Sequence, residues 1–151
     1  MFKVILVCLD GSKLAEQVIP YVIDTGKAFS SKIIILQVLR EPDYGILDKT
    51  KIPLKPSRAV KDFETLKADT RAYLKQASEP IRQAKLEVEY VIRTGEVGKA
   101  IVDYAEKNRV DLVAIATHGS GGLVRAVLGS VADHVIRNLR IPILVIRPVN
   151  K

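Results

Sequence analysis

The sequence predicts an α/β fold, a doubly wound, five-stranded parallel sheet with helices on both faces. Short apolar runs without alternation, as in strands that are buried on both faces, are separated by segments with helical periodicity. The chain has 151 residues, of which 48% are hydrophobic, and this supports one domain with a substantial core but leaves no room for a second. We therefore expect residues 1–151 to form a single domain.

The first part of the chain predicts two strands joined by a helix. Residues 2–9 and 32–39 are apolar runs, the second rich in β-branched residues, which favours buried strands. Residues 14–29 carry apolar side chains at helical spacing, and Pro20 should kink this helix or leave one carbonyl unpaired. Ser12 is a candidate cap for it. Strand, helix and strand in this order imply a right-handed parallel crossover.

The middle of the chain predicts a long loop, a helix and an edge strand. Residues 41–57 contain three prolines and no sustained periodicity, so we expect a loop of the kind that acts as a lid or contacts a partner. Residues 57–84 return to a charged amphipathic helix, which Pro80 should bend or break near its end. Residues 86–92 partly alternate between apolar and polar, which suits a half-exposed strand at the edge of the sheet.

The last part of the chain predicts two strands and two helices. Residues 95–110 place apolar side chains on one helical face. Residues 113–116 form an unbroken apolar run that suits a strand covered on both faces. A further helix should begin near Ser130, and the last strand should span residues 141–146.

Composition restricts the classes of function. The formal net charge is +7, but basic and acidic residues are mixed, as in residues 61–76, and no aromatic residues interleave with a basic stripe, so nucleic-acid binding is disfavoured. The single cysteine, Cys8, lies in an apolar run and is interpreted as a buried thiol outside any disulfide. The N-terminal apolar run is too short to cross a membrane, so we expect a soluble, cytoplasmic protein.

The segment after residues 113–116 changes abruptly from apolar to glycine-rich. Three glycines fall within four positions from Gly119, and Gly129 and Ser130 come directly before the expected helix. Glycine lets backbone N–H groups approach an anion, and the N-terminus of a helix favours negative charge. The layout indicates phosphate binding. A plain glycine-rich turn with Ser130 as the helix N-cap accounts for the same spacing, so this alternative stays open.

The run ATHGSGGLVRAVLGSVADHVIR resembles the signature of the universal stress protein family, whose single-domain, ATP-binding members carry G-x2-G-x9-G-[ST]. Gly119 takes the second position of this pattern, and Gly129 and Ser130 take the last two. Ala116 stands where the family has its first glycine, and it adds a methyl group near the expected ligand. The resemblance covers nearly the whole chain, is weakest in residues 41–57, and implies the strand order 3-2-1-4-5.

The resemblance also implies a site for an adenine nucleotide, ATP with or without Mg²⁺, where the first and fourth strands end and the strand order reverses. It implies that Asp10 contacts the nucleoside and that Val38 packs near adenine, whereas the residue types alone also allow an Asx turn at Asp10 and plain core at Val38. His118 is either a phosphate donor or merely exposed. The residues expected to bind nucleotide are Leu9, Asp10, Val38, Ile115, Ala116, His118, Gly119, Gly129, Ser130 and Val131.

Residues for catalysis are harder to find than residues for binding. Asp10 is a candidate for positioning magnesium or water, but the sequence shows no paired carboxylates, no P-loop lysine and no zinc-ligand spacing, and His134 is interpreted as a helix-face residue. The leading hypothesis is a nucleotide-binding stress-response protein that acts as a dimeric switch or chaperone-like module, with at most slow ATP hydrolysis. One alternative is a structural dimer without nucleotide, favoured if Ala116 closes the pocket. The other is an ATP-using hydrolase, ligase or nucleotidyl transferase on a related fold.

A homodimer is expected from the last strand. Residues 141–146 are apolar on both sides and, by the resemblance, lie at the edge of the sheet. Soluble proteins usually cover such an edge, so we expect two copies to meet along it.

Overall fold

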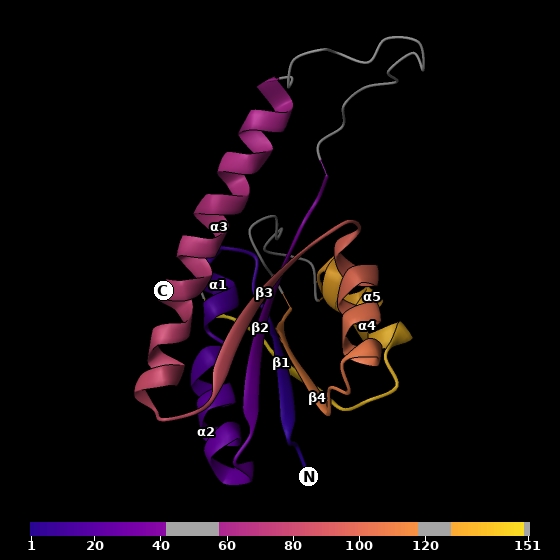
Figure 1. The fold of residues 1–151 in the computed structure, drawn as a ribbon. Coiled ribbons are helices and arrows are strands. Elements are labelled where there is room, and N and C mark those ends of the chain that lie inside the picture. Colours follow the sequence, from indigo (N-terminus) through magenta and orange to yellow (C-terminus); the bar gives the residue numbers. More distant parts are fainter. Residues whose placement is uncertain (42–57, 118–127, 150–151) are drawn as a thin grey trace.

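The computed structural model describes residues 1–41, 58–117 and 128–149, and these form a five-stranded parallel sheet in the order β3-β2-β1-β4-β5 (Figure 1). The predicted fold class and strand order are therefore confirmed. The strands are β1 (Val4–Cys8), β2 (Lys32–Leu39), β3 (Val88–Thr94), β4 (Leu112–Ala116) and β5 (Ile143–Ile146).

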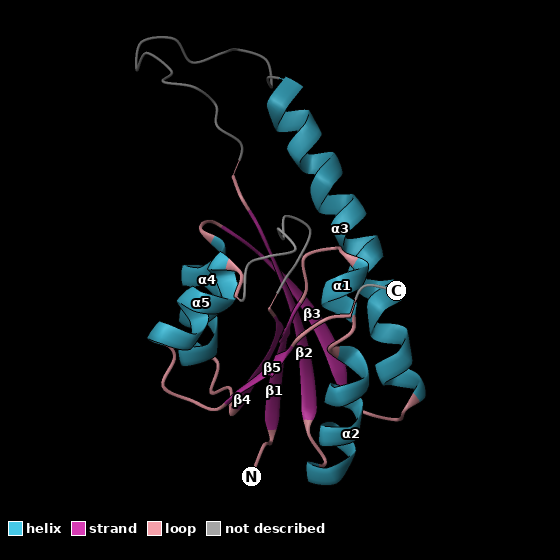
Figure 2. Ribbon diagram, turned by 180° about the vertical axis from the view of Figure 1, so that it is seen from behind, coloured by secondary structure: helices cyan, strands magenta, loops and turns pink. Residues whose placement is uncertain are grey.

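Helices cover both faces of the sheet (Figure 2). One layer consists of α1 (Lys13–Glu16), α2 (Ile19–Phe29) and α3 (Arg58–Gln83), and the other consists of α4 (Val97–Lys107) and α5 (Ser130–Asn138). Alternate residues of a strand point to opposite faces. On β1, Ile5 and Val7 therefore pack under α2 and α3, whereas Leu6 packs against α4 and α5. This alternation gives the domain two apolar cores that share one sheet.

The burial of each strand follows its composition. All five residues of β4 are buried, as the unbroken apolar run predicts. The residues of β3 are half-buried or exposed, and this strand lies at the edge of the sheet next to β2, as its partial alternation predicts. The other edge is β5, which pairs with β4 through Val113 and Ile143 at one end and Ala116 and Ile146 at the other.

Contrary to the prediction, Pro20 does not lie inside one continuous helix, whereas Pro80 does lie near the end of its helix. The helix expected at residues 14–29 is divided into α1 and α2, and Pro20 lies in the first turn of α2, where its missing N–H breaks no helical bond. Pro80, by contrast, lies inside α3, which continues past it to Gln83. The packing of Ala77 and Ile81 against the core on either side of Pro80 holds the helix together there.

The predicted cap of the first helix is confirmed. Ser12 caps α1, since Ala15 N donates a hydrogen bond of 3.2 Å to Ser12 Oγ. Of the loop predicted at residues 41–57, all but Glu41 lies outside the described residues. None of the helices in the described ranges is long and apolar enough to cross a membrane.

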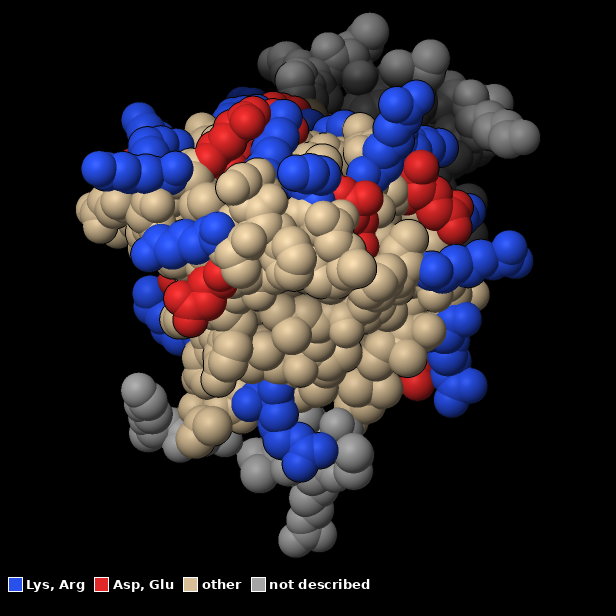
Figure 3. Space-filling model, turned by 90° about the horizontal axis from the view of Figure 1, so that it is seen from below, with Lys and Arg blue, Asp and Glu red and all other residues tan. Residues whose placement is uncertain are grey.

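Charge is distributed in both signs at the end of the molecule where the strands begin. Figure 3 shows this face with Lys, Arg, Asp and Glu around its margin and uncharged residues across its centre. The described part of this face therefore carries no continuous basic surface, which agrees with the mixed charges in the sequence.

Candidate functional site

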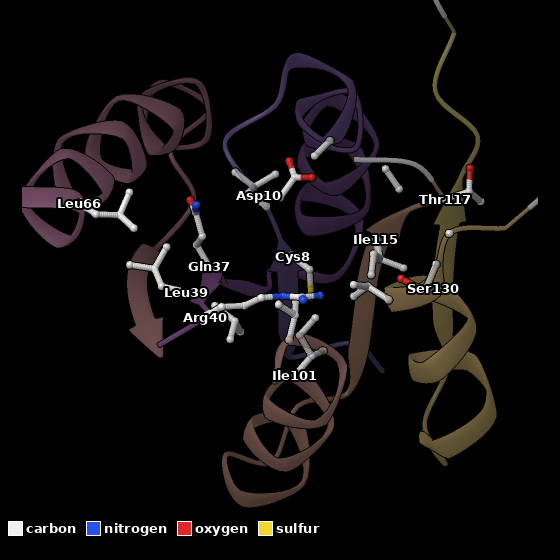
Figure 4. Close-up of a pocket in the computed structure, with 18 residues that line it drawn as sticks. Cys8, Asp10, Gln37, Leu39, Arg40, Leu66, Ile101, Ile115, Thr117 and Ser130 are labelled. Atoms are coloured by element: carbon white, nitrogen blue, oxygen red, sulfur yellow. The ribbon is translucent and has the colours of Figure 1, made fainter. Parts of the chain in front are cut away.

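A cavity of about 590 Å³ lies at the carboxyl ends of β1, β2 and β4, bounded by the start of α5 (Figure 4). Strand order reverses at this place, since β1 pairs with β2 on one side and β4 on the other. Every predicted site residue that the structure describes lines the cavity: Leu9, Asp10, Val38, Ile115, Ala116, Gly129, Ser130 and Val131. His118 and Gly119 lie outside the described residues.

Asp10 stands directly beyond β1 in a tight turn. Ser12 N and Ser12 Oγ both donate to Asp10 Oδ1, at 2.9 and 2.6 Å, and Gly11 adopts φ +89°, which favours glycine. The Asx-turn interpretation is therefore confirmed. Asp10 is also exposed and lines the cavity, so the turn holds a carboxylate at the mouth of the site.

Gly129 brings the start of α5 against the end of β4. Gly129 N donates to Thr117 O at 2.7 Å, and Thr117 N donates in turn to Ile146 O at 2.9 Å. A Cβ on Gly129 would collide with Thr117 O. The backbone of Gly129 has φ −68°, so glycine is needed here for close approach and not for an unusual dihedral angle.

The first turn of α5 faces the cavity through Ser130, Val131 and Ala132. The N-cap is Gly129 and not Ser130, and no side chain caps it. Helical bonding begins with Asp133 N donating to Gly129 O at 2.9 Å, so the N–H groups of Ser130, Val131 and Ala132 precede the first intrahelical bond. Because the Gly129 N–H is already bonded to Thr117, these three groups are the helix-terminal donors that an anion in the cavity can meet.

Apolar side chains form one wall of the cavity. Val38 is half-buried and packs against the core cluster that includes Ile101 and Ile115, and all three also line the cavity. Val38 is therefore both a core residue and a cavity residue. Ala116 is 8% exposed, and its methyl group leaves a cavity of about 590 Å³ beside it.

The structure adds cavity residues that sequence reasoning missed. Gln37 and Arg40 come from the end of β2, and Leu66 comes from α3 across the cavity. Figure 4 shows the Arg40 side chain extending from the end of β2 over the cavity, in the direction of Ser130. Gln37 and Arg40 could have been suspected from the sequence, because Gln37 is a polar residue inside an apolar strand and Arg40 directly follows that strand. Leu66 carried no such signal.

Cys8 and His134 have the structural roles that the sequence predicts for them. Cys8 is buried, and burial raises the pKa of its thiol to about 12, so it lines the cavity floor as a neutral group. His134 lies on the face of α5, where its ring packs over Gly98 of α4; a Cβ on Gly98 would come within 2.8 Å of the ring. In the described ranges, no group of three or more His, Cys, Asp or Glu residues could hold a metal ion.

Comparison with known proteins agrees with this arrangement. Residues 1–147 match the universal stress protein family. The chain belongs to this family. Universal stress protein MJ0531 of Methanocaldococcus jannaschii is 28% identical, in an alignment that covers 100% of this chain and 85% of that protein.

Solved structures show the same universal stress protein fold. The structure of protein MJ0577 of Methanocaldococcus jannaschii has a TM-score of 0.86 at 24% identity, with 100% of this chain and 99% of that chain covered. A universal stress protein of Archaeoglobus fulgidus, solved in complex with dAMP, has a TM-score of 0.67 at 20% identity, with 97% and 98% covered.

Proposed function

We propose that this universal stress protein binds an adenine nucleotide, ATP or a close relative, in the cavity at the carboxyl ends of β1, β2 and β4. The observation that carries the proposal is the first turn of α5, which presents Ser130, Val131 and Ala132 to the cavity at the point where strand order reverses. The dAMP complex of the Archaeoglobus fulgidus protein supports an adenine nucleotide as the ligand class.

The phosphates are assigned to the end of the cavity formed by α5. Backbone N–H groups at a helix N-terminus favour an anion, and Ser130 Oγ adds a donor. Arg40 supplies a full positive charge from the end of β2. An apolar ligand would gain nothing from these groups, so they favour a phosphorylated one.

The nucleoside is assigned to the rest of the cavity. The carboxylate of Asp10 suits the ribose hydroxyls, because an ionised carboxylate only accepts hydrogen bonds. Val38 offers an apolar surface for a base. Mg²⁺ would arrive with the phosphates, since this ion usually keeps several waters and few protein ligands. We further propose that nucleotide binding switches the protein between states in a cytoplasmic stress response, or controls a chaperone-like activity.

We also propose a homodimer through β5. This edge strand exposes 37% of Val145, and Val149 beyond it is 63% exposed. The tail that carries Val149 is held in place, because Gln17 Nε2 donates to Val149 O and Val149 N donates to Gln17 Oε1, each at 2.8 Å. An apolar edge strand with a fixed apolar neighbour suits pairing with a second copy.

The direct test of nucleotide binding uses the purified protein. Mass analysis of the supernatant released by heating detects a carried nucleotide, and calorimetry with ATP and Mg²⁺ detects an added one. We expect at least one of the two to be positive. A protein that neither carries nor binds nucleotide would contradict the proposal and favour the structural dimer.

A further inference from the structure

Gln37 is a buried carboxamide without a full set of hydrogen bonds. It is 8% exposed and lies in β2, where its neighbours Leu36 and Val38 are apolar. Its Oε1 atom is buried and has no hydrogen-bond partner among the described residues. A buried polar atom without a hydrogen-bond partner costs about 1–3 kcal/mol of stability. The Oε1 atom of Gln37 therefore does not stabilise the protein without a ligand.

The carboxamide belongs to the cavity described above. Gln37 lines it, and in Figure 4 its side chain points toward the side where Asp10 and Leu66 lie, across the cavity from Ser130. Its Nε2 atom is 3.8 Å from the place where a Cβ on Gly11 would stand, which puts the amide group beside the turn that follows β1. The carboxamide therefore lies at the opposite end of the cavity from the first turn of α5.

The surroundings of Gln37 suit the base of a nucleotide. Leu39 and Leu66 line the same end of the cavity, and Leu66 is 45% exposed although it is a large apolar residue. Apolar walls with one polar group that fixes orientation are typical of sites for planar ligands. With phosphates assigned to the α5 end, this end of the same cavity is the place left for the base.

The chemistry of the free acceptor narrows the choice of base. Nε2 is the atom of the carboxamide that lies beside Gly11, and Oε1 is the atom without a partner among the described residues. Oε1 needs a donor. Adenine carries an amino group at position 6, whereas hypoxanthine and guanine carry a carbonyl oxygen there.

We propose that Gln37 is the residue that selects adenine, by accepting a hydrogen bond from the 6-amino group through Oε1. This inference rests on the proposed nucleotide site and adds to it the residue that sets base specificity. A 6-oxo base would place an acceptor against the same oxygen, so both atoms would lose their bonds to water without forming a new one.

The experiment compares ATP with inosine triphosphate, which differs from it at position 6. Affinities are measured for the wild type and for Gln37→Met, which keeps the unbranched shape and removes the acceptor; Gln37→Leu is a second variant. Gln76→Leu on the exposed side of α3 is the matched control, since Gln76 does not line the cavity. Thermal melts without ligand check folding, and removal of a buried unpaired oxygen should leave stability equal or higher.

We expect the wild type and Gln76→Leu to prefer ATP over inosine triphosphate by about tenfold, the effect of one buried hydrogen bond. In Gln37→Met, ATP should bind about tenfold more weakly and the preference should disappear. A wild type that binds both nucleotides equally, or a Gln37 variant that keeps the preference, overturns the role of Gln37 while leaving the nucleotide site intact. A wild type that binds neither overturns both proposals.

Discussion

Gly129 and Thr117 meet backbone to backbone where β4 ends and α5 begins. Gly129 N donates to Thr117 O at 2.7 Å, and no Cβ fits between the two residues. This contact fixes the first turn of α5 over the end of the sheet, and with it the N–H groups assigned to phosphate. Glycine at this position therefore serves the fold directly and, in the proposed nucleotide site, would serve the ligand indirectly.

Gly129→Ala should destabilise the protein even without ligand, because the added methyl group must push α5 away from Thr117 O. We expect a loss of about 1–3 kcal/mol in the free energy of unfolding, typical of overpacking. Urea denaturation without nucleotide measures it. Ser130→Ala is the matched control, since the Ser130 side chain is exposed, and it should change stability much less. Equal stability of Gly129→Ala and wild type would contradict the contact.

Ser130→Asp should separate binding from folding. A carboxylate in the first turn of α5 interacts favourably with the helix dipole, so the melting temperature should hold or rise. The same charge would repel a phosphate, and ATP affinity should fall about tenfold or more. Ser130→Asn, which is similar in size but uncharged, should bind more tightly than Ser130→Asp. Undiminished ATP affinity in Ser130→Asp would place the phosphates elsewhere.

Arg40→Gln should weaken ligands in proportion to their phosphate charge. The guanidinium extends over the cavity, so we expect ATP affinity to fall about tenfold and adenosine affinity to change by less than about twofold. Calorimetry with the two ligands measures this difference. Arg71→Gln, an exposed position on α3 outside the cavity lining, should behave as wild type. An equal loss for both ligands would argue against a phosphate contact.

Val145→Lys should convert the expected dimer into a monomer, because a charge on an exposed position of β5 opposes pairing of two copies. Val145 is a better choice than Ile143, which packs against the core and would confound assembly with folding. Light scattering at micromolar concentration measures the mass. Ala72→Lys on the exposed side of α3 should leave the dimer intact. A wild-type monomer, or a Val145→Lys dimer, would exclude this interface.

Cys8 should make stability depend on alkaline pH. Burial raises the pKa of its thiol from 9.0 to about 12, so on a rise in pH the unfolded chain releases the proton first. The contribution of the neutral thiol is complete below pH 9.0 and is lost as pH rises to about 12. Cys8→Ala should therefore lose less stability than the wild type as pH rises through this range. Urea denaturation at several pH values measures it, and parallel curves for the two proteins would contradict it.

The sequence by itself determined the elements, and the family resemblance implied their order in the sheet. Apolar runs without alternation identified the buried strands β1, β2 and β4, because a strand covered on both faces has no polar side. Partial alternation identified β3 as an edge strand. The signature through Gly129 and Ser130 located one end of the cavity, since its residues lie close together along the chain.

Tertiary structure alone decided the rest. Packing against the core, and not the proline itself, decided that Pro20 starts a helix. Packing also decided that α3 continues past Pro80. The opposite end of the cavity joins Gln37 of β2 to Leu66 of α3, two residues with no relationship in the sequence. Periodicity reports which side of one element is buried, but a cavity is formed where several elements fail to fill the space between them, and that depends on how they pack.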